Sequence, residues 1–275
     1  MAPGCTIFPM VANTPETDST WCAWLRFVED EPSFTFRVLR GEGPQDDERV
    51  SAAGDLLLDG LLEVAYLENL ARKYGDAAVQ QYLDARGFKG KLSKRVGDFG
   101  EVLAGAAICE NETLTQPIRK LRYRERADWA MRLSDVFSLR VEGTDITAFC
   151  YMSVKSGVTR PKREVAVDGY DQLLEDNAQE HPEVLFFVAE QLARQGRWEE
   201  IDRLDRAITS AVPTPKMFRL ALVFDRDQWR DDLLMELDDR EQVLEDFAVY
   251  VVRLEHMREV VERAYGLATE RCFSR

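Results

Sequence analysis

The fold is decided by residues 132–157, which read RLSDVFSLRVEGTDITAFCYMSVKSG. Phe137, Leu139 and Val141 alternate with polar residues, a Glu-Gly-Thr-Asp turn follows at residues 142–145, and residues 146–154 read as a second strand. Two strands joined by such a turn predict an antiparallel β-hairpin. In such a pair, the start of the first strand lies beside the end of the second. We therefore expect Asp135 to lie close to residues 153–155.

Further helices and strands are predicted on both sides of this hairpin. Apolar spacing predicts two short strands within residues 21–40, helices within 52–82, a small-residue helix over 97–109, a strand over 118–123, a helix over 164–176, helices within 183–210 and 255–268, and strands over 217–224 and 247–254. This order predicts an α/β protein with a mixed central sheet flanked by helices. We expect a small α+β N-terminal region, residues 1–88, followed by one domain, residues 89–275.

Composition excludes several classes of protein. Apolar runs such as residues 184–189 are far shorter than the roughly 20 residues that cross a bilayer, and the N-terminal residues lack the pattern of a secretory signal. The 5 cysteines include no Cys-x-x-Cys pair, which is typical of reduced thiols. The 2 histidines, His181 and His256, form no zinc motif. We expect a cytoplasmic protein with no membrane association.

Charge is distributed unevenly along the chain. The net charge is −14, yet residues 89–163 contain 15 Lys and Arg against 9 Asp and Glu, so this window is +6 and the remainder is −20. A basic middle within an acidic shell can present an anion-binding surface. It can equally consist of basic side chains that are salt-bridged to acidic neighbours. Both interpretations stay open on the sequence alone.

Three residues of this window have the chemistry of a phosphodiesterase site. Glu101 lies on the small-residue helix, Asp135 at the start of the hairpin and Lys155 at its end. Hydrolysis of a phosphodiester needs a hard divalent ion with oxygen ligands, which carboxylates supply. A nearby lysine can orient the nucleophile or stabilise negative charge in the transition state. We expect Glu101 and Asp135 to hold Mg²⁺ or Mn²⁺ and Lys155 to assist catalysis.

Three segments, GDFGEVLAG (97–105), RLSDVFSLRV (132–141) and YMSVKSG (151–157), occur in this order. With them the chain resembles the PD-(D/E)xK nuclease superfamily and, more narrowly, the HamA/AbpA family of bacterial anti-phage defence proteins, which includes the nuclease component of Hachiman systems. The resemblance is good over residues 90–275 and loose before them. It implies a PD-(D/E)xK nuclease-like core and a metal-dependent DNA endonuclease. It also implies a superfamily 2 helicase partner (HamB-like) that restrains the nuclease until invading DNA is sensed.

One position departs from the pattern of that family. The strand motif is (D/E)-x-K, whereas this chain has Ser153-Val-Lys155. A hydroxyl can coordinate a metal but lacks the negative charge of a carboxylate. Asp168 or Asp171 on the following helix could replace the missing acid. Alternatively, Glu101 and Asp135 could bind metal weakly by themselves, or the protein could bind DNA or its partner without cutting.

Each candidate site residue could instead have a purely structural role. Glu101 could be a partner of the helix dipole, and Asp135 could cap a turn. Basic residues that could follow a DNA backbone, or form a solvated polar face, are Arg119, Arg122, Arg124, Arg126, Arg132, Arg160 and Lys162.

The alternative function is a catalytically silent nuclease fold that binds DNA or a helicase. The acidic remainder of the chain is suited to a basic protein partner. The sequence contains no P-loop motif, so ATP-driven translocation would be supplied by a partner.

Overall fold

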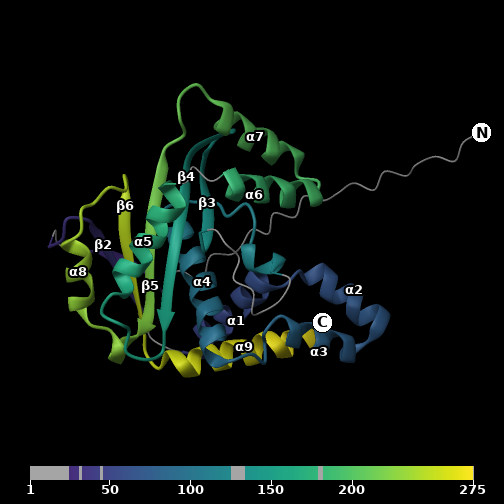
Figure 1. Cartoon of the computed structure of the whole chain (residues 1–275). Coiled ribbons are helices and arrows are strands. Elements are labelled where there is room, and N and C mark those ends of the chain that lie inside the picture. Colours follow the sequence, from purple (N-terminus) through teal and green to yellow (C-terminus); the bar gives the residue numbers. More distant parts are fainter. Residues whose placement is uncertain (1–24, 31–32, 44–45, 125–133, 179–181, 275) are drawn as a thin grey trace, which may run out of the picture.

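The computed structural model describes residues 25–30, 33–43, 46–124, 134–178 and 182–274. Within them, a mixed sheet has the strand order β1-β2-β6-β5-β4-β3 (Figure 1). The pairs β1–β2 and β3–β4 are antiparallel, and the pairs β2–β6, β6–β5 and β5–β4 are parallel. The strands are β1 (Phe27–Glu29), β2 (Arg37–Gly43), β3 (Val136–Glu142), β4 (Asp145–Gly157), β5 (Lys216–Asp225) and β6 (Phe247–Leu254). The predicted mixed α/β fold is confirmed.

Helices cover both faces of this sheet (Figure 1). The α-helices are α1 (Asp47–Leu61), α2 (Val64–Tyr74), α3 (Asp76–Ala85), α4 (Leu92–Asn111), α5 (Val165–Ala178), α6 (Pro182–Arg194), α7 (Trp198–Thr209), α8 (Met235–Asp238) and α9 (Met257–Phe273). The 3₁₀ helices are η2 (Lys120–Tyr123), η3 (Arg226–Gln228) and η4 (Asp231–Leu234). Side chains of β5 alternate between two cores: Ala221 and Val223 pack with α1, α4 and α9, whereas Leu220 and Leu222 pack with α5.

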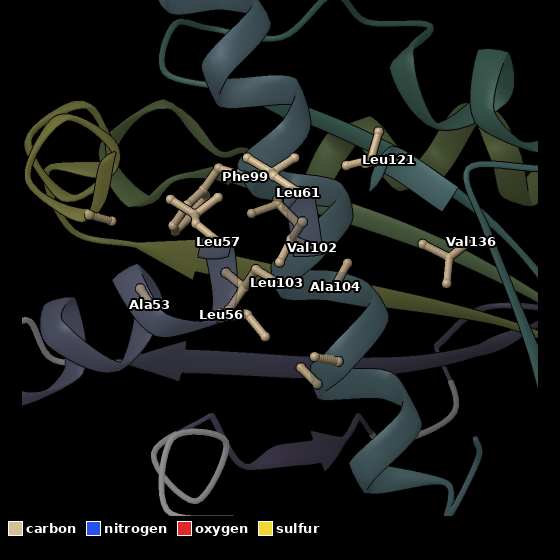
Figure 2. Packing of buried hydrophobic residues seen from close by; sticks show 14 of the residues in the cluster. Ala53, Leu56, Leu57, Leu61, Phe99, Val102, Leu103, Ala104, Leu121 and Val136 are labelled. Carbon is tan, nitrogen blue, oxygen red and sulfur yellow. The ribbon is translucent and has the colours of Figure 1, made fainter. Parts of the chain in front are cut away.

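Close packing of α1 on α4 fixes the position of the predicted small-residue helix. Figure 2 shows Leu57 and Leu61 of α1 beside Val102 and other apolar side chains of α4. A Cβ atom at Gly60 would lie 2.5 Å from a methyl group of Val102. A glycine is therefore required where the two helices cross, because a side chain there would push α4 away from the sheet.

The predicted hairpin is confirmed. Strands β3 and β4 pair from Val136↔Met152 to Glu142↔Asp145, with a register shift between Arg140 and Val141. Gly143 has a φ of 62°, a left-handed conformation that glycine adopts without strain in a tight hairpin turn.

Two predicted elements differ from the structure. Residues 118–123 were expected to form a strand, but Lys120–Tyr123 is the 3₁₀ helix η2. Arg119 and Arg122 both bind Asp59, and residues three apart lie on the same side of a 3₁₀ helix but on opposite faces of a strand. The helical pattern within residues 183–210 is divided into α6 and α7 around Gly196, whose φ is 72°.

The predicted N-terminal region shares its sheet and core with the rest of the chain. Strand β2 pairs with β6, and α1 side chains lie in one core cluster with α4 and α9. The predicted division after residue 88 stays a prediction. Within the described ranges, no helix is long and apolar enough to cross a membrane.

Candidate functional site

Glu101 is brought to the sheet by glycine-dependent packing of α4 on β4. A Cβ atom at Gly100 would lie 2.6 Å from the Cβ of Ser156, so α4 can approach β4 this closely only with glycine at that position. The Ser156 hydroxyl donates a hydrogen bond to the Val96 carbonyl at 3.1 Å. Glu101 follows directly in the chain, and its side chain is half-buried. The close packing predicted for GDFGEVLAG is therefore present.

Asp135 lies in the plane of the sheet, at the residue before β3. Its Oδ2 atom accepts a hydrogen bond of 2.7 Å from the backbone N–H of Val154 on β4. This contact confirms the prediction that Asp135 lies close to residues 153–155. It also fixes the carboxylate beside the middle residue of the Ser-Val-Lys segment.

Glu101 and Asp135 line the same pocket, together with Lys120 and Gln116. Its volume of about 30 Å³ has room for a water molecule or an ion and none for an organic cofactor. Burial and the charge of Asp135 raise the pKa of Glu101 to about 8, although Lys120 opposes this rise. Among the described residues, the Glu101 carboxylate has no hydrogen bond or ion pair. Two carboxylates in this position favour a bound cation, because a cation relieves their mutual repulsion.

Lys120 is a residue of this pocket that sequence reasoning missed. Its ammonium group donates to the Ser134 carbonyl at 2.9 Å and so lies beside the residue that precedes Asp135. The only sequence signal was its place in the basic window. The expected strand over 118–123 gave no reason to place it near Glu101, whereas the turn of η2 does.

Lys155 and Ser153 lie on the other side of β4, facing α5. The Lys155 ammonium donates to Oε1 of Gln172 at 2.6 Å, and the Ser153 hydroxyl donates to the same oxygen at 3.1 Å. Ser153 is fully buried, and the Lys155 side chain passes close to Gly169 of α5. The structure thus brings Glu101 and Asp135 together and places the Lys155 ammonium on the α5 side. Gln172, which binds both motif residues, carried no sequence signal of its own.

The two acids considered as substitutes for Ser153 lie elsewhere on α5. Asp168 is exposed, and Asp171 is ion-paired with Arg240 at 2.7 Å. The part of the chain that the structure describes contains no group of three or more His, Cys, Asp or Glu residues that could hold a metal. A cation would therefore find two carboxylates here. This number fits Mg²⁺, which is commonly held by one or two carboxylates with water and substrate phosphates completing its shell.

The candidate DNA-binding residues differ in their surroundings, and three of them are ion-paired on the protein. Arg119 and Arg122 bind Asp59 of α1. The side chains of Arg124 and Asp98 are 4% and 2% exposed and form a two-point ion pair, so this arginine anchors α4 one turn before Glu101.

The other four candidate DNA-binding residues have no ion pair described on the protein. Arg126 and Arg132 lie outside the described residues. Arg160 and Lys162 are exposed in the loop between β4 and α5.

A comparison with models of known protein families matches residues 20–267 to the HamA family. The match covers nearly the whole chain, including most of the N-terminal region. A search of curated proteins finds no match.

Proposed function

Because the chain belongs to the HamA family, the family of the Hachiman anti-phage defence systems, we propose that it is the metal-dependent DNA endonuclease subunit of such a system. The observation that carries the proposal is the pairing of Glu101 with Asp135 in one small pocket. The topology around them, α4 followed by the β3–β4 hairpin, α5 and the parallel strand β5, is consistent with a nuclease-like core.

In this proposal, Glu101 and Asp135 hold Mg²⁺ or Mn²⁺ through carboxylate oxygens. A bound ion would supply Lewis acidity and would lower the pKa of a water molecule that it binds. The hydrogen bond from Val154 keeps one oxygen of Asp135 fixed, which leaves its other oxygen for the ion. Lys120 adds a positive charge at the same pocket, where negative charge develops on the substrate.

Lys155 remains the proposed catalytic lysine of the strand motif. It follows Val154, the residue that binds Asp135, and its ammonium group is held by a neutral amide oxygen rather than by a carboxylate. A neutral acceptor is a weaker partner than an anion. A DNA phosphate near Asp135 could therefore draw Lys155 away from Gln172.

We further propose that a superfamily 2 helicase restrains and activates this subunit and that the substrate is DNA. Two features of the chain support these partners. The residues outside 89–163 carry a net charge of −20, which suits a basic protein surface. The chain lacks a P-loop motif, so a step driven by ATP requires another subunit.

A second candidate function is a silent nuclease fold that binds DNA or the helicase without cutting. The observation that favours it is Ser153, which is buried and bonded to Gln172 at the position of the acidic residue. A site with one carboxylate fewer holds a divalent ion less tightly.

Cleavage of supercoiled plasmid with Mg²⁺ or Mn²⁺, with and without the helicase, tests the two candidates. We expect nicking by the wild type and none by Glu101→Gln or Asp135→Asn, because both variants remove ligand charge while keeping side-chain size. The matched control is Glu110→Gln, which changes an exposed glutamate of the same helix and should cut normally. If the wild type never nicks DNA under these conditions, the silent subunit is the correct function.

A further inference from the structure

A second polar pocket lies where the chain leaves β4 and β5. It has a volume of about 180 Å³ and is lined by Arg160, Pro161, Arg163, Gln228, Arg230, Asp232 and Leu233. Three of these side chains are guanidinium groups from two separate loops. Arginine is the residue best suited to bind phosphate oxygens, because its donors form a planar fork.

The topology of the sheet explains why the two loops meet. Strands β4 and β5 are parallel, and Gly157 pairs with Phe224 at their ends. The loop after β4 and η3 after β5 therefore begin side by side. Open α/β sheets bind ligands in the crevice outside the carboxyl ends of such strands.

The pocket carries a positive charge that its own acids do not cancel. Arg163 is paired with Glu236 and Arg230 with Asp232. Arg160 is exposed and has no hydrogen-bond or ion-pair partner within the described part of the chain. Gln228 adds a neutral amide that can donate to an anion. An anion in this pocket would thus find a guanidinium group already available to bind it.

We propose that this pocket binds one phosphate group of a DNA backbone. Its volume lies below the roughly 300 Å³ at which pockets for whole small-molecule ligands begin, which favours a single phosphate over a nucleotide. Arg160 follows Val154 by six residues, a span of at most about 22 Å, so the pocket is close enough to contact the DNA strand that the candidate metal site would hold. The proposal rests on the proposed function in one respect, namely that the ligand is DNA.

Binding of labelled DNA to the full-length protein, measured by fluorescence anisotropy in EDTA over a series of salt concentrations, tests this pocket. Arg160→Ala should weaken binding about 3- to 10-fold and reduce the slope of log K against log salt by about 0.9, the value for one lost phosphate contact. Gln228→Glu, which places a negative charge in the pocket, should weaken binding at least as much. Arg72→Ala removes an exposed arginine of α2 and serves as the control, with binding unchanged.

Other outcomes overturn the proposal. Unchanged affinity and salt slope in both pocket variants would exclude a phosphate contact there. Binding of inorganic phosphate that is lost in Arg160→Ala, while that variant binds DNA as the wild type does, would assign the pocket to free phosphate instead. Failure of the wild type to bind DNA would also refute it. A protein that binds DNA through Arg160 but never cuts would uphold this pocket while refuting the endonuclease.

Discussion

The two sides of strand β4 differ in the chemistry that they hold. On the α4 side, Glu101 and Asp135 share a small pocket, and burial and their like charges raise the pKa of Glu101 to about 8. On the α5 side, Ser153 and Lys155 bind one neutral oxygen of Gln172. Within the described residues, the Glu101 carboxylate therefore has no ion pair, although Lys120 adds a positive charge to its pocket, whereas the Lys155 ammonium has a neutral acceptor.

This difference shows how one substitution is accommodated in a buried site. With an acid at position 153, Lys155 would have an anionic neighbour on its own side of the strand, because residues two apart share a face. Serine leaves the lysine without that neighbour, and a half-buried ammonium group needs an acceptor. Gln172 supplies it. The polar groups on the α5 side thus have partners without a metal, whereas the Glu101 carboxylate on the α4 side has no hydrogen bond or ion pair among the described residues.

Neutralising Asp135 should have the largest effect. Asp135→Asn keeps an oxygen that accepts from Val154, so the hairpin should fold normally, but it removes the ligand charge. Loss of several kcal/mol of transition-state stabilisation corresponds to at least about 100-fold slower DNA cleavage, measured by plasmid nicking in Mn²⁺. Asp145→Asn at the exposed turn of the same hairpin should cut normally, and equal activity of both variants would remove Asp135 from the site.

Comparing the two lysines tests which side of β4 supplies the catalytic cation. Lys155→Ala should slow cleavage about 100-fold, as expected for loss of a group that stabilises charge in the transition state. Lys120→Ala should slow cleavage only about tenfold, because Lys120 contributes only the positive charge that it adds to the pocket. Single-turnover kinetics at saturating metal separates these values from effects on metal binding. The reverse order would assign the catalytic role to the α4 side alone.

An acid at position 153 tests whether the α5 side of β4 contributes to metal binding. Ser153→Asp restores the (D/E)-x-K pattern next to Lys155, whose charge offsets part of the cost of burying the new carboxylate. Because Ser153 faces Gln172 of α5 and the pocket of Glu101 and Asp135 lies on the α4 side, we expect the variant to bind Mn²⁺ as tightly as the wild type by calorimetry. Ser153→Asn, of similar size and without charge, is the control. Tighter Mn²⁺ binding by the aspartate variant alone would show that position 153 faces the ion.

The stability of the metal-free protein should also depend on Glu101. Glu101 has a pKa of about 8 in the folded state and about 4.3 when unfolded. Its contribution to stability is therefore fully present below about pH 4.3 and is lost as the pH rises to about 8. Near pH 8.5, Glu101→Gln should unfold at a higher temperature than the wild type, because each unit of this pKa shift corresponds to about 1.4 kcal/mol, and near pH 4 the two should coincide. Equal midpoints at both pH values would contradict this shift.

The sequence predicted the fold where patterns are local. Alternation in residues 137–141 and the turn at Gly143 were sufficient for the β3–β4 hairpin, and antiparallel pairing then placed Asp135 beside Val154. The glycines and alanines of residues 97–109 indicated a closely packed helix, which α4 is. These conclusions need only the period of a strand and the size of a side chain.

Contacts between distant segments could not be predicted in the same way. Lys120 reaches the pocket because η2 turns where a strand was expected. Gln172 meets Lys155 only after α5 packs on β4. Arg124 is a basic residue, as a DNA-binding residue would be. Its burial against Asp98 depends on the tertiary fold. A linear pattern gives no information about which partner a charged side chain will find.

The most direct test of a metal site between Glu101 and Asp135 is a crystal structure of the protein soaked with Mn²⁺, with the ion located by its anomalous scattering. We expect one anomalous peak within coordination distance of carboxylate oxygens of both residues, and its absence in Asp135→Asn crystals. A peak bound only on the α5 side, or no peak at saturating Mn²⁺ with both carboxylates ionised, would contradict it.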